Sequence, residues 1–376
     1  MPAKKNAHPV LTRRELNRAT LDRQLLLRRS SLSAEDAVRH LVGLQAQNTK
    51  PPYYALAARL DGFRPEDLSA LMESRAVARM VTMRSTIHTH TADDCLALRP
   101  LMQAGGPDRE LKVFLGRNGL DGVDLDRLAA LSRELVEEAP RPVKELRTLL
   151  LAEWPDADPL ALTVAARCLL PLVQVTPRGL WGRSGQVALT TAERWFGRPV
   201  ADPPPAPDAT VRRYLAAFGP ASVKDMQTWS MLTGLGEAFE RLRPELLVFQ
   251  DEKGVELFDL PDAPRPEADT PAPPRFLAEF DNLLLSHADR TRVVSPEYRG
   301  RTWTGNQAHR TFLLDGFLAG TWRLDAGKDS VVLTIEAFAA PSRAQRAAME
   351  EEAGRTLAVL AADVPHHDVR FADPAE

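Results

Sequence analysis

Residues 210–260, TVRRYLAAFGPASVKDMQTWSMLTGLGEAFERLRPELLVFQDEKGVELFDL, decide the fold of this chain. Gly219-Pro220 ends a first amphipathic stretch, because proline cannot continue a helix. Ser222 and Asp225 then have the spacing of a capping box, which opens a second helix. The pattern predicts three helices and a β-hairpin, over 211–218, 222–234, 237–243 and then 246–249 with 255–260. This order of elements is typical of a winged helix.

Two earlier stretches repeat the pattern less clearly, without a fixed repeat period. Between residues 140 and 195 we expect a helix over 142–151 and a second one that Asp158-Pro159 opens. Strands near 173–175 and 187–189 then flank the glycine-rich segment 176–185. Between residues 11 and 99 we expect helices followed by one strand over 78–91.

The sequence therefore predicts an α+β fold made of tandem winged-helix domains followed by a small antiparallel β-barrel. The domain boundaries that we expect are 11–100, 101–202 and 206–262 for the winged helices, and 275–376 for the β-barrel-like domain with its closing helix. A proline-rich linker at 203–205 separates the second domain from the third, and another at 261–274 separates the third from the fourth. Barrel strands are expected at 280–285, 292–294, 311–318, 321–324 and 331–338, with a helix over 342–360. Residues 1–10 and the last residues are predicted to be flexible ends.

Composition limits how this chain can bind a nucleic acid. Its 376 residues are 44% hydrophobic, which is enough for substantial cores, and its formal net charge is −3. A protein that coats nucleic acid through bulk charge is basic, so any nucleic-acid contact must come from local patches. Only eight of the 48 basic residues are lysine. This bias favours bidentate phosphate contacts, although genomic base composition explains it equally well.

The two cysteines, Cys95 and Cys168, lie in apolar sequence without a CxxC partner, so we expect neither a disulfide framework nor a cysteine-rich zinc site. No signal peptide and no run of about 20 apolar residues is visible. The expected protein is reduced, cytoplasmic and monomeric, with no membrane contact and no cofactor.

The motif Gln45-Ala46-Gln47 is the leading catalytic candidate. Ser33 and Asp36 predict a helix start, and apolar residues at helical spacing place Gln45 on the buried face of that helix. An amide donates and accepts hydrogen bonds but neither donates nor removes a proton at ordinary pH. Such a pair suits a reaction whose leaving group departs easily. The alternative, that both glutamines are helix-end and surface residues, stays open at this point.

Other residues are candidates for lining a cleft or contacting DNA. Arg84 and His88 share one face of the predicted strand 78–91, and an Arg-rich, aromatic tip is predicted around residues 299–307. Three carboxylates, Glu279, Asp281 and Asp289, lie in and after an expected strand. Orienting a nucleophile is one role open to them, but we anticipate pairing with Arg290 or Arg292. His88 and His90 lack a third ligand at suitable spacing, so no metal is expected. The full set of cleft or DNA-contact candidates is Arg84, His88, Asp281, Arg178, Arg183, Arg299, Arg301 and Trp303.

Three segments together resemble the AlkZ/YcaQ-type winged-helix DNA glycosylases: Leu44–Gln47, Met83–His88 and Phe280–Leu285. The resemblance covers most of the chain, from about Leu11 to Phe338. It implies tandem winged helices plus a β-barrel in a C-shaped, DNA-embracing molecule. It also implies catalysis by a motif of Gln, an apolar residue, and then Gln or Asp, which maps onto Gln45, Ala46 and Gln47. This chain has the amide version of the motif, so its base strength differs from that of relatives with a carboxylate.

The resemblance implies a monofunctional DNA glycosylase that hydrolyses the N-glycosidic bond of N7-alkylated purines in double-stranded DNA. It further implies unhooking of interstrand crosslinks such as those of azinomycin B, for DNA repair and antibiotic self-resistance. The alternative hypothesis is a non-catalytic winged-helix transcription regulator. The expected recognition helices, 160–170 and 237–243, argue against it, because they lack an uninterrupted set of base-reading side chains. A third hypothesis is a protein that sequesters a drug.

Overall fold

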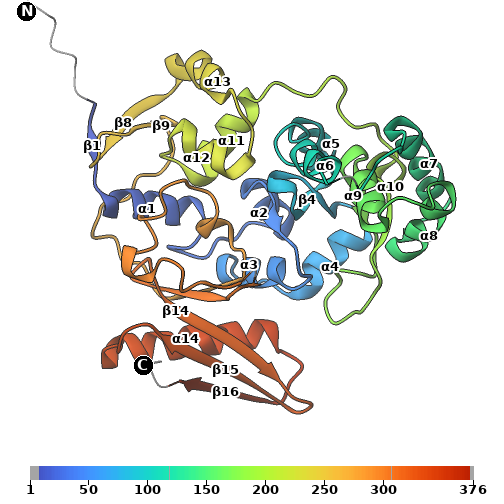
Figure 1. Ribbon diagram of the computed structural model, residues 1–376. Helices are drawn as coiled ribbons and strands as arrows, with labels where there is room; N and C mark the ends of the chain where they lie inside the picture. The colour runs from blue at the N-terminus through green and yellow to red at the C-terminus, as the bar shows by residue number, and fades with distance from the viewer. Residues whose placement is uncertain (1–7, 118, 306, 373–376) are drawn as a thin grey trace, which may run out of the picture.

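The three helices and the hairpin predicted at 210–260 are present in the computed structural model, which describes residues 8–117, 119–305 and 307–372 (Figure 1). The Ser222 hydroxyl accepts from the amide of Asp225, and the Asp225 carboxylate accepts from the amide of Ser222 at 2.8 Å, which confirms the capping box. The second helix ends four residues early because Met231 has φ 62°. These elements are α11 (Asp208–Phe218), α12 (Val223–Ser230), α13 (Leu235–Leu242), η2 (Arg243–Glu245), β8 (Leu247–Asp251) and β9 (Glu256–Asp259).

The N-terminal part of the chain differs from the prediction at two places that matter for function. The helix that opens at Ser33 ends at His40, before the glutamine motif, and the strand expected over 78–91 is a hairpin. The elements are β1 (Val10–Leu11), α1 (Arg13–Arg23), α2 (Ala34–His40), β2 (Leu44–Gln45), α3 (Pro51–Arg59), α4 (Pro65–Glu73), β3 (Val77–Val81), η1 (Met83–Ser85), β4 (Ile87–Thr91) and α5 (Ala92–Leu101).

Residues 107–196 supply the second group of helices and strands, coloured green at the right of Figure 1. The Asp158 side chain accepts from the amide of Ala161 and caps the helix that Pro159 opens, as predicted. The elements are α6 (Pro107–Leu115), α7 (Leu125–Glu138), β5 (Arg141–Pro142), α8 (Val143–Glu153), α9 (Pro159–Leu169), β6 (Leu172–Gln174), β7 (Ala188–Thr191) and α10 (Ala192–Phe196).

The first two groups share one sheet, which sequence patterns did not predict. Its strand order is β2-β4-β3-β6-β7-β5, and the junction is the antiparallel pairing of Met80 with Val173. A second sheet joins the chain start to residues 247–259, because β1 runs parallel to β8. Segments far apart in sequence are therefore fixed against one another by backbone hydrogen bonds.

The C-terminal sheet corrects the predicted barrel. Its order is β10-β13-β14-β15-β16, so within the described residues it is an open sheet with β10 and β16 as edges, and β16 runs parallel to β15. Part of the expected flexible tail is thus the strand β16, while residues 1–7 and 373–376 of the expected flexible ends lie outside the described residues. The elements are β10 (Arg275–Leu277), η3 (Asn282–Leu284), η4 (Pro296–Tyr298), β11 (Trp303–Thr304), β12 (Gln307–Ala308), β13 (Thr311–Leu314), β14 (Phe317–Ala326), β15 (Ser330–Ala337), α14 (Arg343–Leu360) and β16 (His366–Phe371).

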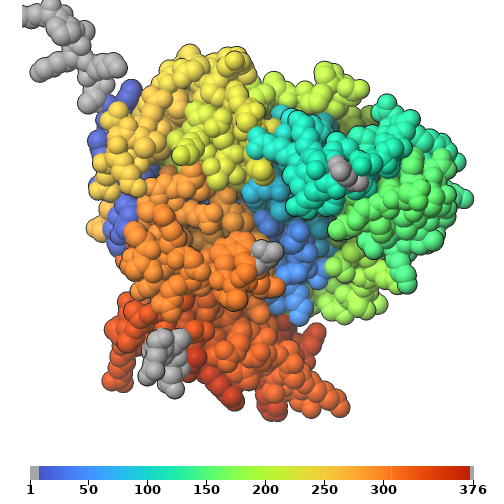
Figure 2. Space-filling model, in the orientation of Figure 1, coloured from blue at the N-terminus to red at the C-terminus, as the bar shows by residue number. Residues whose placement is uncertain are grey.

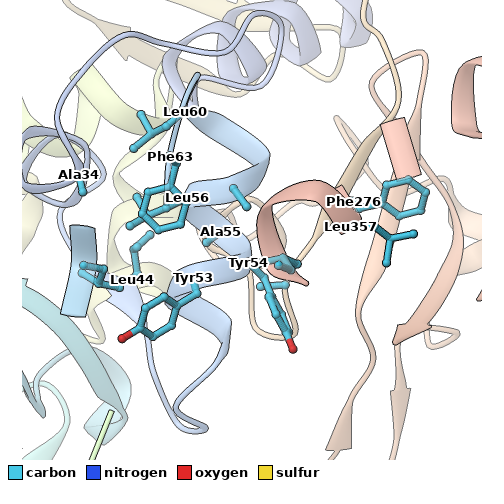
Figure 3. Close-up of a cluster of buried hydrophobic side chains, with 14 of the residues drawn as sticks. Ala34, Leu44, Tyr53, Tyr54, Ala55, Leu56, Leu60, Phe63, Phe276 and Leu357 are labelled. Carbon is cyan, nitrogen blue, oxygen red and sulfur yellow. The ribbon is translucent and has the colours of Figure 1, made fainter. Parts of the chain in front are cut away.

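One apolar core ties this sheet to the segment that follows the glutamine motif. Tyr54 of α3 packs against Trp322 with ring centroids 5.7 Å apart, and Trp322 packs against Phe276 at 5.6 Å. Figure 3 shows side chains of α3 between Leu44 on one side and Phe276 and Leu357 on the other. Burial of this many apolar and aromatic side chains makes α3 a rigid base for the loop that precedes it.

Candidate active site

The glutamine motif lies on a short strand rather than on a helix. Val42 and Gly43 have φ of 55° and 92°, which turns the chain out of α2 and into β2. A side chain at Gly43 would place its Cβ only 2.3 Å from Cε1 of His90, so this turn requires glycine for space as well as for φ. Gln45 is paired in register with His88 of β4, and the amide of Ala46 donates to the carbonyl of Ile87 at 2.7 Å. The divergence of roughly 200° that a helix would impose on the two glutamines therefore does not apply.

The Gln45 side chain is held by an arginine from the β3–β4 hairpin. Nη2 of Arg84 donates to Oε1 of Gln45 at 2.8 Å. Guanidinium nitrogens can only donate, so the contact assigns the oxygen of this amide unambiguously. Gln45 is 7% exposed, and its Nε2 has no protein acceptor among the described residues. The amide therefore has an N–H₂ group that is unclaimed by the described part of the protein.

The side-chain oxygen of Gln47, like that of Gln45, is bound within the fold. This Oε1 atom accepts from the backbone amide of Ile87 at 3.1 Å, in place of a sheet carbonyl. The residue is exposed, and its own N–H₂ group has no acceptor among residues 8–117, 119–305 and 307–372. Both glutamines thus use their oxygens within the fold and leave their nitrogens as donors.

A second arginine, which sequence reasoning missed, fixes the backbone between the glutamines. Nη2 of Arg79 donates to the carbonyl of Ala46 at 2.6 Å, and its Nη1 donates to Gln174 of β6 at 2.7 Å. Arg79 is only 2% exposed, and burial lowers its pKa to about 10, so it stays charged at neutral pH. A single charged residue inside the apolar run Val77–Val81 was the available signal.

His88 lies behind Arg84 and does not line an open surface, which corrects its assignment as a cleft residue. It is 1% exposed, and its Nε2 lies 3.2 Å from Nη2 of Arg84. Its Nδ1 lies 3.0 Å from the carbonyl of Thr86, so Nδ1 carries the proton and Nε2 accepts. The Thr82 hydroxyl continues this buried chain to His90 at 2.8 Å.

The buried histidines make stability depend on pH. Burial lowers the pKa of His88 well below 6.5, that of His90 to about 4 and that of His287 to about 3. Below about pH 6.5 the histidines of the unfolded chain are protonated, whereas those of the folded chain stay neutral. Stability is therefore lost as pH falls below about 6.5. We expect the free energy of unfolding to fall by about 1–2 kcal/mol per histidine between pH 6.5 and 5, because the slope approaches about 1.4 kcal/mol per pH unit once the unfolded histidine is fully protonated. Urea denaturation at pH 7.5, 6 and 5 measures this, and an unchanged midpoint would contradict it.

Asp281 has no access to DNA, contrary to its assignment as a cleft residue. Its carboxylate forms a bidentate pair with Arg59 of α3 at 2.7 and 2.8 Å, and both side chains are fully buried. The expected strand around it is the 3₁₀ turn η3, because the Asp281 carboxylate caps the amide of Leu283. The next residue, Asn282, donates to the carbonyl of Gly43 at 2.7 Å. This segment therefore braces the turn that leads into Gln45.

The remaining carboxylates also differ from the expected pairing. Asp289 pairs with Lys253 at 2.5 Å, rather than with Arg290 or Arg292. Glu279 lies 3.8 Å from Arg310, and its other oxygen accepts from Asn48 at 3.4 Å. Arg290, which was expected to pair with a carboxylate, is exposed and has no carboxylate partner in the described part of the chain.

The other basic candidates fall into two regions. Arg178 is half-buried and donates to the carbonyl of Gly185 at 3.0 Å, while Arg183 is exposed in the same loop. Arg299 and Arg301 are exposed ahead of the hairpin β11–β12, where Trp303 packs edge-on against Phe280 at 5.4 Å. The guanidinium of Arg301 stacks over Phe338 at 4.2 Å. Asn306 of the expected hairpin tip lies outside the described residues.

One face of the molecule brings together parts of the chain that are far apart in sequence (Figure 2). In Figure 2 a strip of light-blue surface from the N-terminal segment is framed by orange, teal and green surfaces. A cavity of about 1000 Å³ elsewhere is lined by Asp22, Arg28 and Arg265 and by neither glutamine. No group of three metal-ligating side chains and no helix long and apolar enough to cross a bilayer occurs among the described residues.

This chain belongs to the DNA glycosylase AlkZ-like family, whose sequence profile matches residues 38–359. It is 25% identical over 324 residues to the interstrand DNA cross-link repair glycosylase of Streptomyces sahachiroi, covering 81% of this chain and 85% of that protein. The solved structure of Streptomyces sahachiroi DNA glycosylase AlkZ has the same fold, with a TM-score of 0.79 at 22% identity. That match covers 96% of this chain and all of the solved chain.

Proposed function

We propose that this protein is a monofunctional DNA glycosylase that hydrolyses the N-glycosidic bond of N7-alkylguanine in double-stranded DNA. Gln45 and Gln47 are its proposed catalytic residues. The observation that carries the proposal is the matched pair of amides, each with its oxygen bound inside the fold and its N–H₂ group without an acceptor among the described residues. Family membership supplies the reaction class.

The amides fit this substrate chemically. N7-alkylation gives the purine a positive charge, so the base leaves as a neutral molecule without protonation. The sugar becomes oxocarbenium-like in the transition state, and water then attacks it. Amide N–H groups can hold that water and a sugar or phosphate oxygen in place, and positioning of this kind lowers barriers by several kcal/mol. A base whose departure needs protonation by the enzyme is a poor substrate for such a site.

The substrate range proposed here includes interstrand crosslinks through N7 of guanine, such as those of azinomycin B, with a role in DNA repair and antibiotic self-resistance. The relative from Streptomyces sahachiroi is a cross-link repair glycosylase, which supports this extension. Gln45 lies on β2, Gln47 lies in the exposed bend that follows it, and the cavity of about 1000 Å³ lies elsewhere. An open site of this kind accepts a bulky lesion better than a tight pocket for a flipped base.

Exposed arginines supply the proposed duplex contacts. Arg290 and Arg299 are exposed and carry no carboxylate partner among the described residues. Partial burial of the Arg290 side chain and the nearby charge of Arg299 lower the pKa of Arg290. Unpaired guanidinium groups bind phosphates and position a duplex without reading its sequence. Together with Arg183 and Arg301 they belong to the proposed DNA-embracing face of a monomer with tandem winged helices.

The transcription-regulator alternative loses support in the structure. Arg241 of α13 pairs with Asp208 at 2.7 Å, and Arg243 pairs with Glu240 and Glu256 at 2.7 and 2.9 Å. Arg167 of α9 pairs with Glu110 at 2.6 Å. Basic side chains already bound to carboxylates are poor readers of base edges.

Incubation with a duplex that contains one N7-methylguanine tests the function. We expect release of the free base and an abasic site whose strand breaks only after alkali, without trapping by borohydride. A duplex crosslinked through N7 of guanine tests unhooking in the same assay. Protection of a specific undamaged sequence without base release would establish the regulator instead.

A further inference from the structure

The loop between β3 and β4 holds its arginine in a constrained conformation. Arg84 and Ser85 have φ of 56° and 54°, a left-handed region that side chains other than glycine seldom occupy. The amide of Thr82 donates to the carbonyl of Thr86 at 3.1 Å and closes the loop. Strained backbone of this kind persists only where its surroundings enforce it.

Two other parts of the chain enforce this conformation. A Cβ on Gly106 would lie 2.4 Å from the amide nitrogen of Ser85, so only glycine allows that approach. The Ser85 hydroxyl donates to Glu110 of α6 at 2.5 Å. The loop is thus held in place by Gly106 and by Glu110 of α6.

Both terminal nitrogens of the Arg84 guanidinium are bound within the protein. Nη1 donates to the carbonyl of Trp229 in α12 at 2.7 Å, and Nη2 serves both Gln45 and His88. No carboxylate among the described residues pairs with it, although its charge persists at neutral pH because burial lowers its pKa only to about 10. A guanidinium needed for a DNA phosphate would keep nitrogens free, and here both terminal nitrogens are bound.

We propose that Arg84 is a positioning residue for excision. By donating to Oε1 of Gln45 it fixes the orientation of that amide, so that the N–H₂ group faces the sugar of the lesion. This deepens the proposed function and rests on it. His88, as a neutral imidazole that accepts from Nη2, holds the guanidinium in the plane that this contact requires.

Arg84→Met tests the proposal, because methionine keeps an unbranched apolar stem and removes the guanidinium. Single-turnover release of N7-methylguanine is expected to fall about 10²-fold, the effect of misplacing a reacting group by about 1 Å. The Kd for the lesion duplex is expected to change less than about 3-fold, with an unchanged salt dependence. Arg212→Met, which removes an exposed arginine paired with Glu245, is the matched control and should retain the wild-type rate.

Two further measurements separate positioning from a merely structural effect. Added guanidinium ion is expected to raise the excision rate of Arg84→Met at least about 10-fold, compared with the same concentration of sodium chloride. In Gln45→Ala, the additional Arg84→Met change should have less than about 3-fold effect, because its target is absent.

The Arg84→Met variant could instead bind the lesion duplex more weakly and excise at the wild-type rate, with the slope of log affinity against log salt concentration reduced by about one. That result would show that Arg84 binds a phosphate and would overturn the proposal. Full additivity with Gln45→Ala would overturn it as well. Failure of the underlying function is distinguishable, because wild-type protein would then release no base, or Gln45→Ala would release it at the wild-type rate.

Discussion

Gln45→Glu is expected to lower the single-turnover rate of N7-methylguanine release by about 10²–10³-fold, the usual loss when one preorganised donor is removed. The two side chains have nearly the same shape, so the change isolates chemistry from packing. One carboxylate oxygen would pair with Arg84, which already donates to this position at 2.8 Å. The other oxygen would present an acceptor where the wild-type protein presents a donor.

This substitution distinguishes two ways in which a glutamine can assist. If Gln45 accepted a proton from the attacking water, glutamate would be the stronger base and the rate would rise. The orientation imposed by Arg84 excludes that role for the wild-type amide. A Gln45→Glu protein that excises as fast as the wild type, or faster, would contradict the donor assignment. Lesion-duplex affinity measured on the same preparation controls for a general loss of binding.

Asp281→Ala is expected to reduce the free energy of unfolding by about 3–5 kcal/mol, because it leaves the Arg59 guanidinium buried without its counter-charge. Both side chains are fully buried, and the bidentate contact joins α3 to the segment before η3. Urea denaturation at pH 7.5 measures the loss. Glu351→Ala, which breaks an exposed pair with Arg355, should cost less than about 1 kcal/mol.

The same variant tests whether Asp281 has a role in DNA contact. At a temperature where Asp281→Ala remains folded, its affinity for undamaged duplex should keep the wild-type salt dependence. A stability equal to that of the wild type, combined with a changed salt slope, would show that the carboxylate meets DNA. It would also show that the pair with Arg59 contributes little.

The elements that follow local chemistry were predictable from the sequence. Ser222 and Asp225 form the expected capping box, and Asp158 caps the helix that Pro159 opens. Each of these capping interactions joins residues close together in the sequence, so capping residues and hydrophobic periodicity locate the helix starts. The sheet that joins β3 to β6 was not predictable, because strand pairing between residues 80 and 173 depends on tertiary contacts.

The errors near the site have a common physical cause. Val42, Arg84, Ser85 and Phe280 all have positive φ without being glycine. A turn at such residues has no signal in composition, so the pattern predicted a continued helix, one long strand and a barrel strand instead. At Ser85 the turn is enforced by a tertiary contact, the close approach of Gly106 to its backbone amide.

The sequence singles out the glutamine motif as a catalytic candidate but does not predict its geometry. The resemblance points to Gln45 and Gln47, and the structure places Gln45 on β2 and Gln47 in the bend after it, with both side-chain oxygens bound. The roles of Arg79 and Arg84 depend on contacts with the motif across β4 and its hairpin. A single sequence does not reveal which polar groups those side chains reach.

Release of N7-methylguanine by the double variant Gln45→Ala/Gln47→Ala, compared with wild type under single-turnover conditions, tests the central claim most directly. Thermal unfolding at pH 7.5 and lesion-duplex affinity establish that the variant is folded and binds. We expect the variant to bind the duplex and to release the base at least about 10³-fold more slowly, as for removal of two positioned donors. Base release at the wild-type rate by the folded double variant would contradict the claim that these two amides perform the excision.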